Sequence, residues 1–319
     1  MIVKPRLIPR YLQQLEALLR RLPENHPKRE AISEDLAKRR AGYQGEKNID
    51  YPLSFLPEKE YHIFHDLRLF DGSHHFQIDT LIVSPRFILI LEVKNITGTL
   101  FFDSAFNQLI RTRDGKEEAF PDPLIQVERQ SLQLKKWLKN NNYVNMPVSE
   151  LVVIGSPRTL LKTAPGNQYI YNKVILAPKL PQEITKLEKT FPTKVIHSKR
   201  FLKLSSLLID HHCPLHVNVL KRYEITDKEV LKGVCCPQCN YVPMTRARGK
   251  WMCFQCLHTS KDCYKETLHD YSLLINSTIT NKKAREFLLV SSQTVMKSLL
   301  ANANLSHSGA TKGTLYHLE

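Results

Sequence analysis

The chain has 319 residues, of which 42% are hydrophobic and 24% are charged, and it contains 11 glycines and 18 prolines. This composition supplies enough apolar material for a packed core and excludes a disordered or collagenous polymer, and the length predicts about two domains. The 46 Lys and Arg residues against 31 Asp and Glu give a formal net charge of +15. Such a charge favours polyanionic partners, namely nucleic acid or an anionic membrane surface, with a basic solvated surface as the alternative.

The chain contains no apolar run of membrane-spanning length, and its first residues lack the apolar segment and cleavage site of a signal peptide. Its seven cysteines are odd in number and concentrate in the C-terminal third. This distribution favours metal ligands and free thiols over a secreted disulfide framework. We therefore expect a cytoplasmic protein without a membrane partner.

Apolar periodicity predicts alternating helices and strands in the first two thirds of the chain. Leucines at helical spacing predict a packing helix over residues 10–22, and a second helix begins near Pro27 and reaches glycines at residues 41–46, where another element can approach closely. Apolar runs divided by short turns predict strands over residues 61–69, 76–83, 87–94, 99–102 and 107–111. A turn at residues 114–115 leads toward a helix over residues 123–140, followed by strands at 148–154 and 173–176. These elements predict a mixed sheet with helices packed on it.

The composition changes after Cys213, where cysteine clusters appear and apolar density falls. Residues 221–232 are expected to form a polar connecting helix, and the chain is expected to be helical again after Cys263. The predicted parts are an N-terminal packing helix (1–26), an α/β domain (27–210), a linker helix (211–232), a cysteine-rich module (233–262) and a helical module (263–319).

Charged residues interrupt two of the apolar strands, at Asp79 and at Glu92-Val93-Lys94. Because strand side chains alternate between faces, Glu92 and Lys94 share one face, and a hairpin can place Asp79 beside them. Two carboxylates can bind Mg²⁺, which also binds phosphate oxygens, and Lys94 can orient an attacking water or help to deprotonate it. The alternative is a structural ion pair near the end of a strand, because charges within apolar strands cost free energy unless they are paired.

These residues resemble a known family of nucleases. Asp79 followed by Glu92-Val93-Lys94 resembles the D…(D/E)xK signature of the restriction-endonuclease-like PD-(D/E)xK superfamily. More narrowly, residues 30–155 resemble the nuclease-related domain called NERD, through Gly42-Tyr43-Gln44-Gly45-Glu46, Ile78-Asp79-Thr80-Leu81, Glu92-Val93-Lys94-Asn95, Gly98 and Gln126 with Gln130. The resemblance implies a restriction-endonuclease-like α/β fold, a mixed sheet flanked by helices, with a nuclease centre that uses Mg²⁺ or Mn²⁺.

The resemblance also implies a role for each matching residue. Asp79 and Glu92 match the metal-binding acids, and Lys94 matches the catalytic lysine. Glu46 matches the acid on the preceding helix, and Gln126 matches the polar position on the following helix. Taken alone, Glu46 fits an exposed helical acid equally well, and Gln126 fits either a sheet-facing or an exposed polar row.

Two matched cysteine pairs predict a zinc site. Cys236-Pro237-Gln238-Cys239 is followed after thirteen residues by Cys253-Phe254-Gln255-Cys256. Two thiolates of each pair can reach one ion, and the two pairs complete a tetrahedron around Zn²⁺. The spacing resembles a zinc ribbon, with residues 250–252 as the strand that enters the second pair. Four thiolates leave no open coordination position, so we expect a structural zinc; a redox dithiol is the alternative, and it does not predict two matched pairs.

The C-terminal residues predict two short helices, 282–289 and 293–300, with Thr280 and Asn281 as a cap and a break at residues 291–292. This pattern resembles a helix-turn-helix, and residues 312–316 are expected to add a wing-like hairpin. The predicted shared core consists of Ala284, Phe287, Leu288, Val295, Leu299 and Leu300. The positions predicted to be available to a nucleic-acid groove are Ser292, Gln293, Thr294 and Lys297. A helical hairpin used for packing or dimerisation is the alternative.

The favoured hypothesis is a cytoplasmic, Mg²⁺-dependent nuclease that acts on nucleic acid, with DNA favoured as the substrate. In this hypothesis the zinc ribbon and the terminal helices add affinity for nucleic acid. The alternatives are a non-catalytic DNA-binding regulatory protein, in which the sheet residues are structural, and a protein-interaction scaffold.

Overall fold

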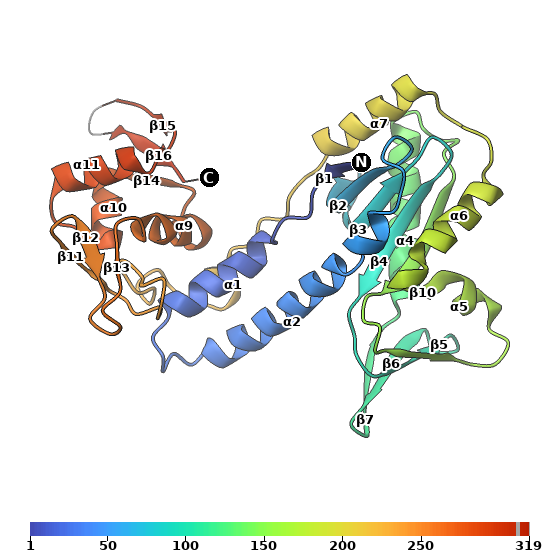
Figure 1. Cartoon of the computed structure of the whole chain (residues 1–319), viewed down its shortest axis with the longest axis horizontal. Helices are drawn as coiled ribbons and strands as arrows, with labels where there is room; N and C mark the ends of the chain where they lie inside the picture. The colour runs from blue at the N-terminus through green and yellow to red at the C-terminus, as the bar shows by residue number, and fades with distance from the viewer. Residues whose placement is uncertain (311–312, 319) are drawn as a thin grey trace. The chain divides into compact units, whose positions relative to one another are not determined.

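The computed structural model describes residues 1–310 and 313–318, and the chain divides into two compact units (Figure 1). Unit 1 consists of Met1–Leu7 and Ala41–Leu215, and unit 2 consists of Ile8–Arg40 and His216–Glu319. Helix α2 (Arg29–Lys47) therefore contributes its first part to unit 2 and its last turns to unit 1. The finer five-part division of the chain stays a prediction.

Unit 1 is built on a six-stranded mixed sheet with the order β1-β2-β3-β4-β8-β10. Strands β2, β3 and β4 pair antiparallel as predicted, whereas β1 on β2, β4 on β8 and β8 on β10 are parallel. The strands are β1 (Ile2–Lys4), β2 (His62–Phe70), β3 (His75–Val83), β4 (Ile88–Lys94), β8 (Val148–Ile154) and β10 (Val174–Leu176).

Helices cover both faces of this sheet. Apolar side chains of α4 (Pro123–Asn140) and α7 (Ser198–Asp210) belong to the core on one face. On the other face the core includes α3 (Asp50–Leu53) and α6 (Leu180–Thr190), with the short helix η1 (Ala177–Lys179) between β10 and α6. The predicted mixed sheet flanked by helices is confirmed, and α4 and β8 have their predicted bounds. Helices α6 and α7 were not among the predicted elements.

A second sheet of unit 1 has the order β7-β6-β5-β9. Its elements are β5 (Thr99–Asp103), β6 (Gln108–Arg113), β7 (Lys116–Pro121) and β9 (Leu160–Thr163), and the helix α5 (Gln168–Lys173) follows β9 in the chain. Strand β7, which was not among the predicted elements, lies between the turn at Asp114 and Gly115 and the predicted helix α4. Both turn residues have positive φ, 51° and 75°, which is the geometry that closes a tight hairpin, and β7 returns along β6.

Unit 2 joins the N-terminal helix α1 (Arg10–Arg21) to the C-terminal part of the chain. Arg21 is fully buried and its Nε donates to Asp270 Oδ2 of α9 (Tyr264–Leu274) at 2.9 Å. The predicted connecting helix is wrong, because α8 (Val219–Arg222) is the only helix within residues 211–232 and reaches just two residues into the predicted range 221–232. Glu224 takes a left-handed φ of 57°, which ends the helix, and the Thr226 amide then donates to the Glu229 carboxylate at 2.8 Å.

The cysteine-rich segment and the C-terminal segment of unit 2 each form a small sheet. The first sheet is antiparallel and consists of β11 (Thr245–Ala247), β12 (Lys250–Met252) and β13 (Thr259–Ser260). The second has the order β14-β16-β15, with β14 (Thr278–Thr280), β15 (His307–Ser308) and β16 (Leu315–His317). Between β14 and β15 lie the two predicted helices, α10 (Asn281–Leu288) and α11 (Gln293–Asn302).

The C-terminal segment matches the prediction with two corrections: strand β14, which pairs with β16, interrupts the chain that was expected to be helical after Cys263, and one core position of α11 differs. Thr280 caps α10 by accepting a hydrogen bond from the Lys283 amide. In α11, Val295 is only half-buried, and Met296 is fully buried in its place. The predicted wing includes Lys312, which lies outside the described residues. No helix among the described residues combines the length and the apolar character that crossing a bilayer requires.

Candidate functional site

The face of β4 that carries Glu92 and Lys94 points toward helix α4. Ile88 and Ile90 belong to the core beneath α4, whereas Leu89 and its alternating neighbours belong to the opposite core. Because strand side chains alternate, Glu92 and Lys94 follow Ile90 on the α4 side, as predicted.

Glu92 and Lys94 form a connected group with two glutamines of α4. Lys94 Nζ lies 2.6 Å from Glu92 Oε1 and donates to Gln126 Oε1 at 3.0 Å. Gln130 Nε2 donates to Glu92 Oε2 at 2.8 Å, so each carboxylate oxygen has a partner. The Glu92 side chain is only 2% exposed, whereas that of Lys94 is 26% exposed. Gln126 and Gln130 thus face the sheet, which resolves the alternative that the sequence left open.

Asp79 lies at the end of the β3–β4 ladder beside this group. The ladder pairs Thr80 with Leu91, so Asp79 and Glu92 are the next opposed positions in the same register. Asp79 Oδ2 accepts a hydrogen bond from the Val93 amide at 2.9 Å. Burial raises the pKa of Asp79 well above its usual range, and the nearby charges of Glu92 and Glu46 raise this pKa further.

The regular alternation of β2 and β3 is interrupted beside Asp79. In a regular strand, one residue separates neighbouring side chains on the same face. Ile78 and Leu81 of β3 belong to the same core although two residues separate them, and Phe64 and Leu67 of β2 also share that core with two residues between them. In β2 the interruption contains Asp66, whose φ of 51° lies in the left-handed region. This irregular backbone changes the direction of the side chains next to Asp79, and the sequence pattern did not reveal it.

Glu46 reaches the site because α2 packs closely on the chain that follows β4. A Cβ added to Gly45 would lie 2.1 Å from Asn95 Cβ, and one added to Gly155 would lie 2.8 Å from the Gly45 carbonyl oxygen. The predicted close approach at this glycine is therefore confirmed. It brings Glu46 to the ends of β4 and β8, which precede Asn95 and Gly155 in the chain.

A buried arginine from the first residues of the chain holds Glu46. Arg6 Nη1 lies 2.6 Å from Glu46 Oε2, and the Arg6 side chain is 4% exposed. Burial raises the pKa of Glu46 to about 7, with Arg6 opposing the shift and the charges of Asp66 and Glu92 adding to it. Sequence reasoning missed Arg6, because no motif or apolar pattern distinguishes it from the other basic residues near the N-terminus.

The structure therefore brings the five predicted catalytic residues into one neighbourhood, linked by hydrogen bonds or by charge. Hard carboxylate oxygens and crowded negative charge fit Mg²⁺ or Mn²⁺. Among the described residues, however, only the cysteine set contains three or more His, Cys, Asp or Glu ligand atoms that all lie within 4.8 Å of one another. Glu92 and Glu46 lie close enough to Asp79 to raise its pKa, but the carboxylates are not gathered as tightly as the cysteines.

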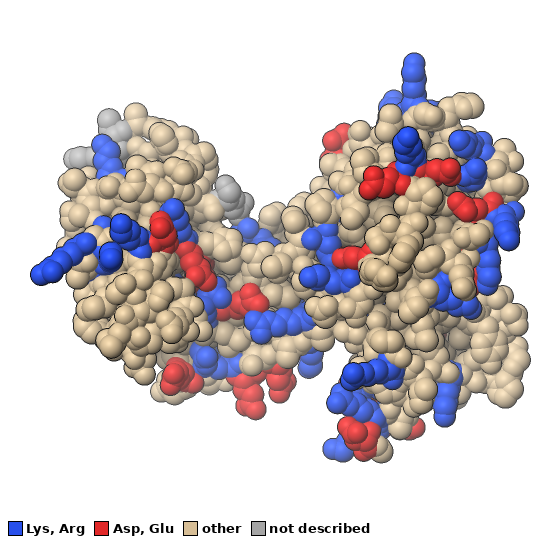
Figure 2. Space-filling model, viewed as in Figure 1, with Lys and Arg blue, Asp and Glu red and all other residues tan. Residues whose placement is uncertain are grey.

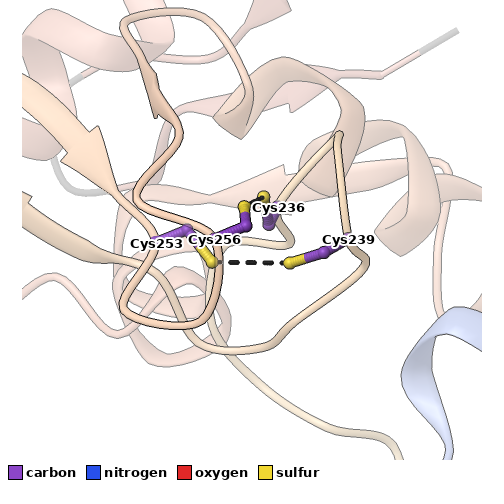
Figure 3. Close-up of side chains that lie close together, drawn as sticks. All are labelled: Cys236, Cys239, Cys253 and Cys256. Atoms are coloured by element: carbon purple, nitrogen blue, oxygen red, sulfur yellow. Dashed lines mark hydrogen bonds between the residues drawn. The ribbon is translucent and has the colours of Figure 1, made fainter.

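The sulfur atoms of Cys236, Cys239, Cys253 and Cys256 converge on one point (Figure 3). Cys236 Sγ and Cys256 Sγ are 3.6 Å apart, and Cys239 Sγ and Cys253 Sγ are 3.5 Å apart. Ligands at about 2.3 Å in a tetrahedral zinc site are separated by about 3.8 Å. The cysteine cluster can therefore hold Zn²⁺ after only small adjustments.

The two cysteine pairs have the same local backbone. The Asn240 amide donates to the Cys236 carbonyl at 2.9 Å, and the Leu257 amide donates to the Cys253 carbonyl at 2.9 Å. Asn240 and Leu257 have φ values of 59° and 60°, so each loop turns back through a left-handed residue directly after its second cysteine. Cys235 lies apart from the cluster, with its thiol directed at backbone carbonyls. The matched loops agree with the predicted ribbon.

Comparison with known proteins identifies the part of the chain that carries the carboxylates. Residues 41–155 match the family model of NERD, the nuclease-related domain. This span contains all five predicted catalytic residues, Glu46, Asp79, Glu92, Lys94 and Gln126, and the resemblance inferred from the sequence is confirmed. The nuclease-related domain thus occupies much of unit 1 but excludes Arg6.

The comparisons with solved structures and with curated proteins give no further information about function. The crystal structure of protein VC1899 from Vibrio cholerae is similar at 13% sequence identity with a TM-score of 0.27, and the similarity covers 58% of this chain and 52% of that chain. The chain thus spans about half the length of that protein, and so low a TM-score supports no conclusion about fold or function. No curated protein matches the chain.

Proposed function

We propose that the protein is a metal-dependent nuclease that hydrolyses phosphodiester bonds of nucleic acid, with DNA as the substrate. The observation that carries this proposal is the group formed by Asp79, Glu92 and Lys94 where the pairing of β3 with β4 ends. These residues lie in the nuclease-related domain, which suggests nucleic acid as the substrate. The carboxylates also influence one another electrostatically, as the raised pKa of Asp79 indicates.

In this proposal each residue has a defined task. A divalent ion bound by Asp79 and Glu92 would supply Lewis acidity and offset the charge of the phosphodiester. Lys94 is more exposed than Glu92, and its ammonium can donate a hydrogen bond to an attacking water or to a phosphate oxygen. Gln126 fixes the position of that ammonium at 3.0 Å. Glu46, with a pKa of about 7, can accept or release a proton near neutral pH.

We further propose that unit 2 supplies affinity for nucleic acid and holds a structural Zn²⁺ on its four cysteines. The exposed side chains Ser292, Gln293, Thr294 and Lys297 begin α11 or lie in its first turns, where the recognition helix of a helix-turn-helix contacts base edges. Lys and Arg side chains are distributed over the visible faces with Asp and Glu between them (Figure 2). The net charge of +15 favours binding of polyanions. Because the cations are spread in this way, the charge does not indicate which surface forms the interface.

The test is cleavage of labelled DNA and RNA by the purified chain in Mg²⁺ or Mn²⁺, compared with Asp79→Asn and Lys94→Met. Glu117→Gln is the matched control, because Glu117 is an exposed acid on β7. We expect Asp79→Asn and Lys94→Met to lower the cleavage rate by at least about 100-fold, the loss typical of a missing electrostatic group at a reaction centre. Glu117→Gln should cut like the wild type. Equal cutting by all four proteins would indicate a contaminating nuclease and refute the proposal.

One observation favours a second function, that of a non-catalytic DNA-binding regulatory protein. Both oxygens of Glu92 are hydrogen-bonded within the protein, and its side chain is 2% exposed. A structural ion pair would have the same appearance. This alternative predicts DNA binding that weakens with salt, together with no cleavage in either metal, so the same preparation distinguishes the two functions.

A further inference from the structure

The first residues of the chain reach into the candidate site although they precede the nuclease-related domain. That domain begins at residue 41, whereas Arg6 contacts Glu46 across a sequence separation of 40 residues. We propose that Arg6 is a positioning residue for Glu46, so that the segment Met1–Leu7 completes the active site. This inference rests on the proposed nuclease function and extends the site beyond the matched domain.

The contacts of Arg6 connect three of the elements near Asp79, namely α2, β2 and β3. Its Nη1 binds Glu46 of α2, and its Nη2 donates to Thr80 Oγ1 of β3 at 3.1 Å and lies 2.8 Å from His65 Nδ1 of β2. Thr80 is the direct neighbour of Asp79 in the chain. One planar guanidinium therefore fixes the distance between the acid on α2 and the strand that carries Asp79, a task for which its rigid fork of donors is well suited.

Lys4 of the same segment supports the irregular backbone opposite Asp79. Lys4 Nζ donates to the carbonyls of His65 and Asp66 at 2.8 and 2.9 Å. Asp66 is the left-handed residue of β2, and the register that pairs His65 with Thr80 places Asp66 opposite Asp79. The parallel pairing of β1 with β2 delivers both cations to this point. The N-terminal segment thus contacts the site through two residues: Arg6 binds the Glu46 carboxylate, and Lys4 binds backbone carbonyls of β2.

A purely structural ion pair between Arg6 and Glu46 makes different predictions. Such a pair would hold α2 on the sheet, so its loss would lower the stability of unit 1 and leave metal binding unchanged in the folded protein. A positioning residue acts through Glu46, so its removal should change metal binding or cleavage only while Glu46 is present. Residues that support metal ligands or catalytic groups in this way typically change affinity or activity by about 10- to 100-fold.

The experiment uses the full chain with Arg6→Met, Arg6→Lys, Glu46→Gln and the double variant of Arg6→Met with Glu46→Gln. The matched control is Arg86→Met, whose guanidinium also forms an ion pair within unit 1, with Glu60 at 3.0 Å. The readouts are the Mn²⁺ dissociation constant from calorimetry, the cleavage rate on labelled DNA and the urea midpoint of unfolding. We expect Arg6→Met to weaken Mn²⁺ binding or to slow cleavage by about 10- to 100-fold. The double variant should be no worse than the more damaged single variant.

The outcomes separate this inference from the proposed function. Two results would overturn the role of Arg6 and leave the nuclease proposal intact. The first is wild-type Mn²⁺ affinity and cleavage in folded Arg6→Met. The second is a double variant in which the effects of Arg6→Met and Glu46→Gln multiply. A folded wild type that neither binds Mn²⁺ nor cleaves would overturn both. If Arg6→Met does not fold, Arg6→Lys decides, because lysine keeps the charge and loses the fork. Wild-type values in that variant would refute the positioning role.

Discussion

Two glycines in the last turns of α2 offer a matched test of the packing that positions Glu46. Gly42 and Gly45 belong to the same helix, yet their surroundings differ. A Cβ at Gly42 would meet no atom within 4 Å, whereas a Cβ at Gly45 would lie 2.1 Å from Asn95 Cβ and 3.2 Å from Asn95 Cα. We therefore expect Gly42→Ala to stabilise unit 1 and Gly45→Ala to destabilise it.

The magnitudes follow from helix propensity and overpacking. Replacing glycine by alanine inside a helix is worth about 0.5–1 kcal/mol, and this gain applies to both positions. At Gly45 the nearest atom is Asn95 Cβ, which no side-chain rotation can move away. Ordinary van der Waals contact begins near 3.4 Å, so a 2.1 Å contact requires the helix and this strand end to separate by about 1.3 Å. Overpacking of this kind costs typically about 1–3 kcal/mol and occasionally more, and because the helix-propensity gain is common to both variants, they should differ by about 1–3 kcal/mol.

Urea unfolding followed by tryptophan fluorescence measures this difference. The chain has two tryptophans, Trp137 in unit 1 and Trp251 in unit 2, so a Trp251→Phe background makes the signal report on unit 1 alone. The midpoint should rise for Gly42→Ala and fall for Gly45→Ala. Equal stabilisation by both alanines would refute the close packing of α2 on Asn95 and, with it, the reason given for the position of Glu46.

The remaining predictions concern unit 2. Cys256→Ser, or removal of zinc by a chelator, should unfold the ribbon, because so small a module depends on its metal for stability. Zinc content and limited proteolysis measure the loss. A ribbon that stays resistant to protease without zinc would contradict this prediction. Leu257→Gly should tighten zinc retention against a chelator by about 1 kcal/mol, since a left-handed φ of 60° strains leucine but not glycine. Ser292→Ala should lower the free energy of unfolding of unit 2 by about 1 kcal/mol, because the Ser292 hydroxyl caps α11 by accepting from the Val295 amide. The exposed Ser298→Ala within α11 is its control, and equal thermal midpoints for these two variants would refute the cap.

The sequence predicted those elements whose pattern is strong and local. Helix α4 and strand β8 were placed with their correct bounds, because dense apolar residues leave few alternatives, and β12 was placed by the resemblance to a zinc ribbon. Strand β7 was missed because its sequence, Lys-Glu-Glu-Ala-Phe-Pro, is largely charged and exposed. It is a strand because it pairs with β6, and pairing partners are not visible in a short window of sequence.

The candidate site divides in the same way. Asp79, Glu92 and Lys94 were found because charged residues in apolar strands are unusual, and Cys236 with its three partners because the spacing is distinctive. Arg6 was not found, because its contact with Thr80 spans 74 residues and depends on the register of β1 against β2. Nothing in the local sequence around Arg6 specifies that pairing.

The missed arginine changes the charge balance of the proposed metal site. Arg6 pairs with Glu46 and Lys94 pairs with Glu92, so two of the three acids have a cation of the protein at 2.6 Å. Asp79 accepts its hydrogen bond from a neutral amide instead, and its pKa is raised by burial and by the other two acids. A bound divalent cation would relieve that repulsion. The protein's own cations pair with Glu46 and Glu92, and a metal ion would supply an ionic partner to Asp79.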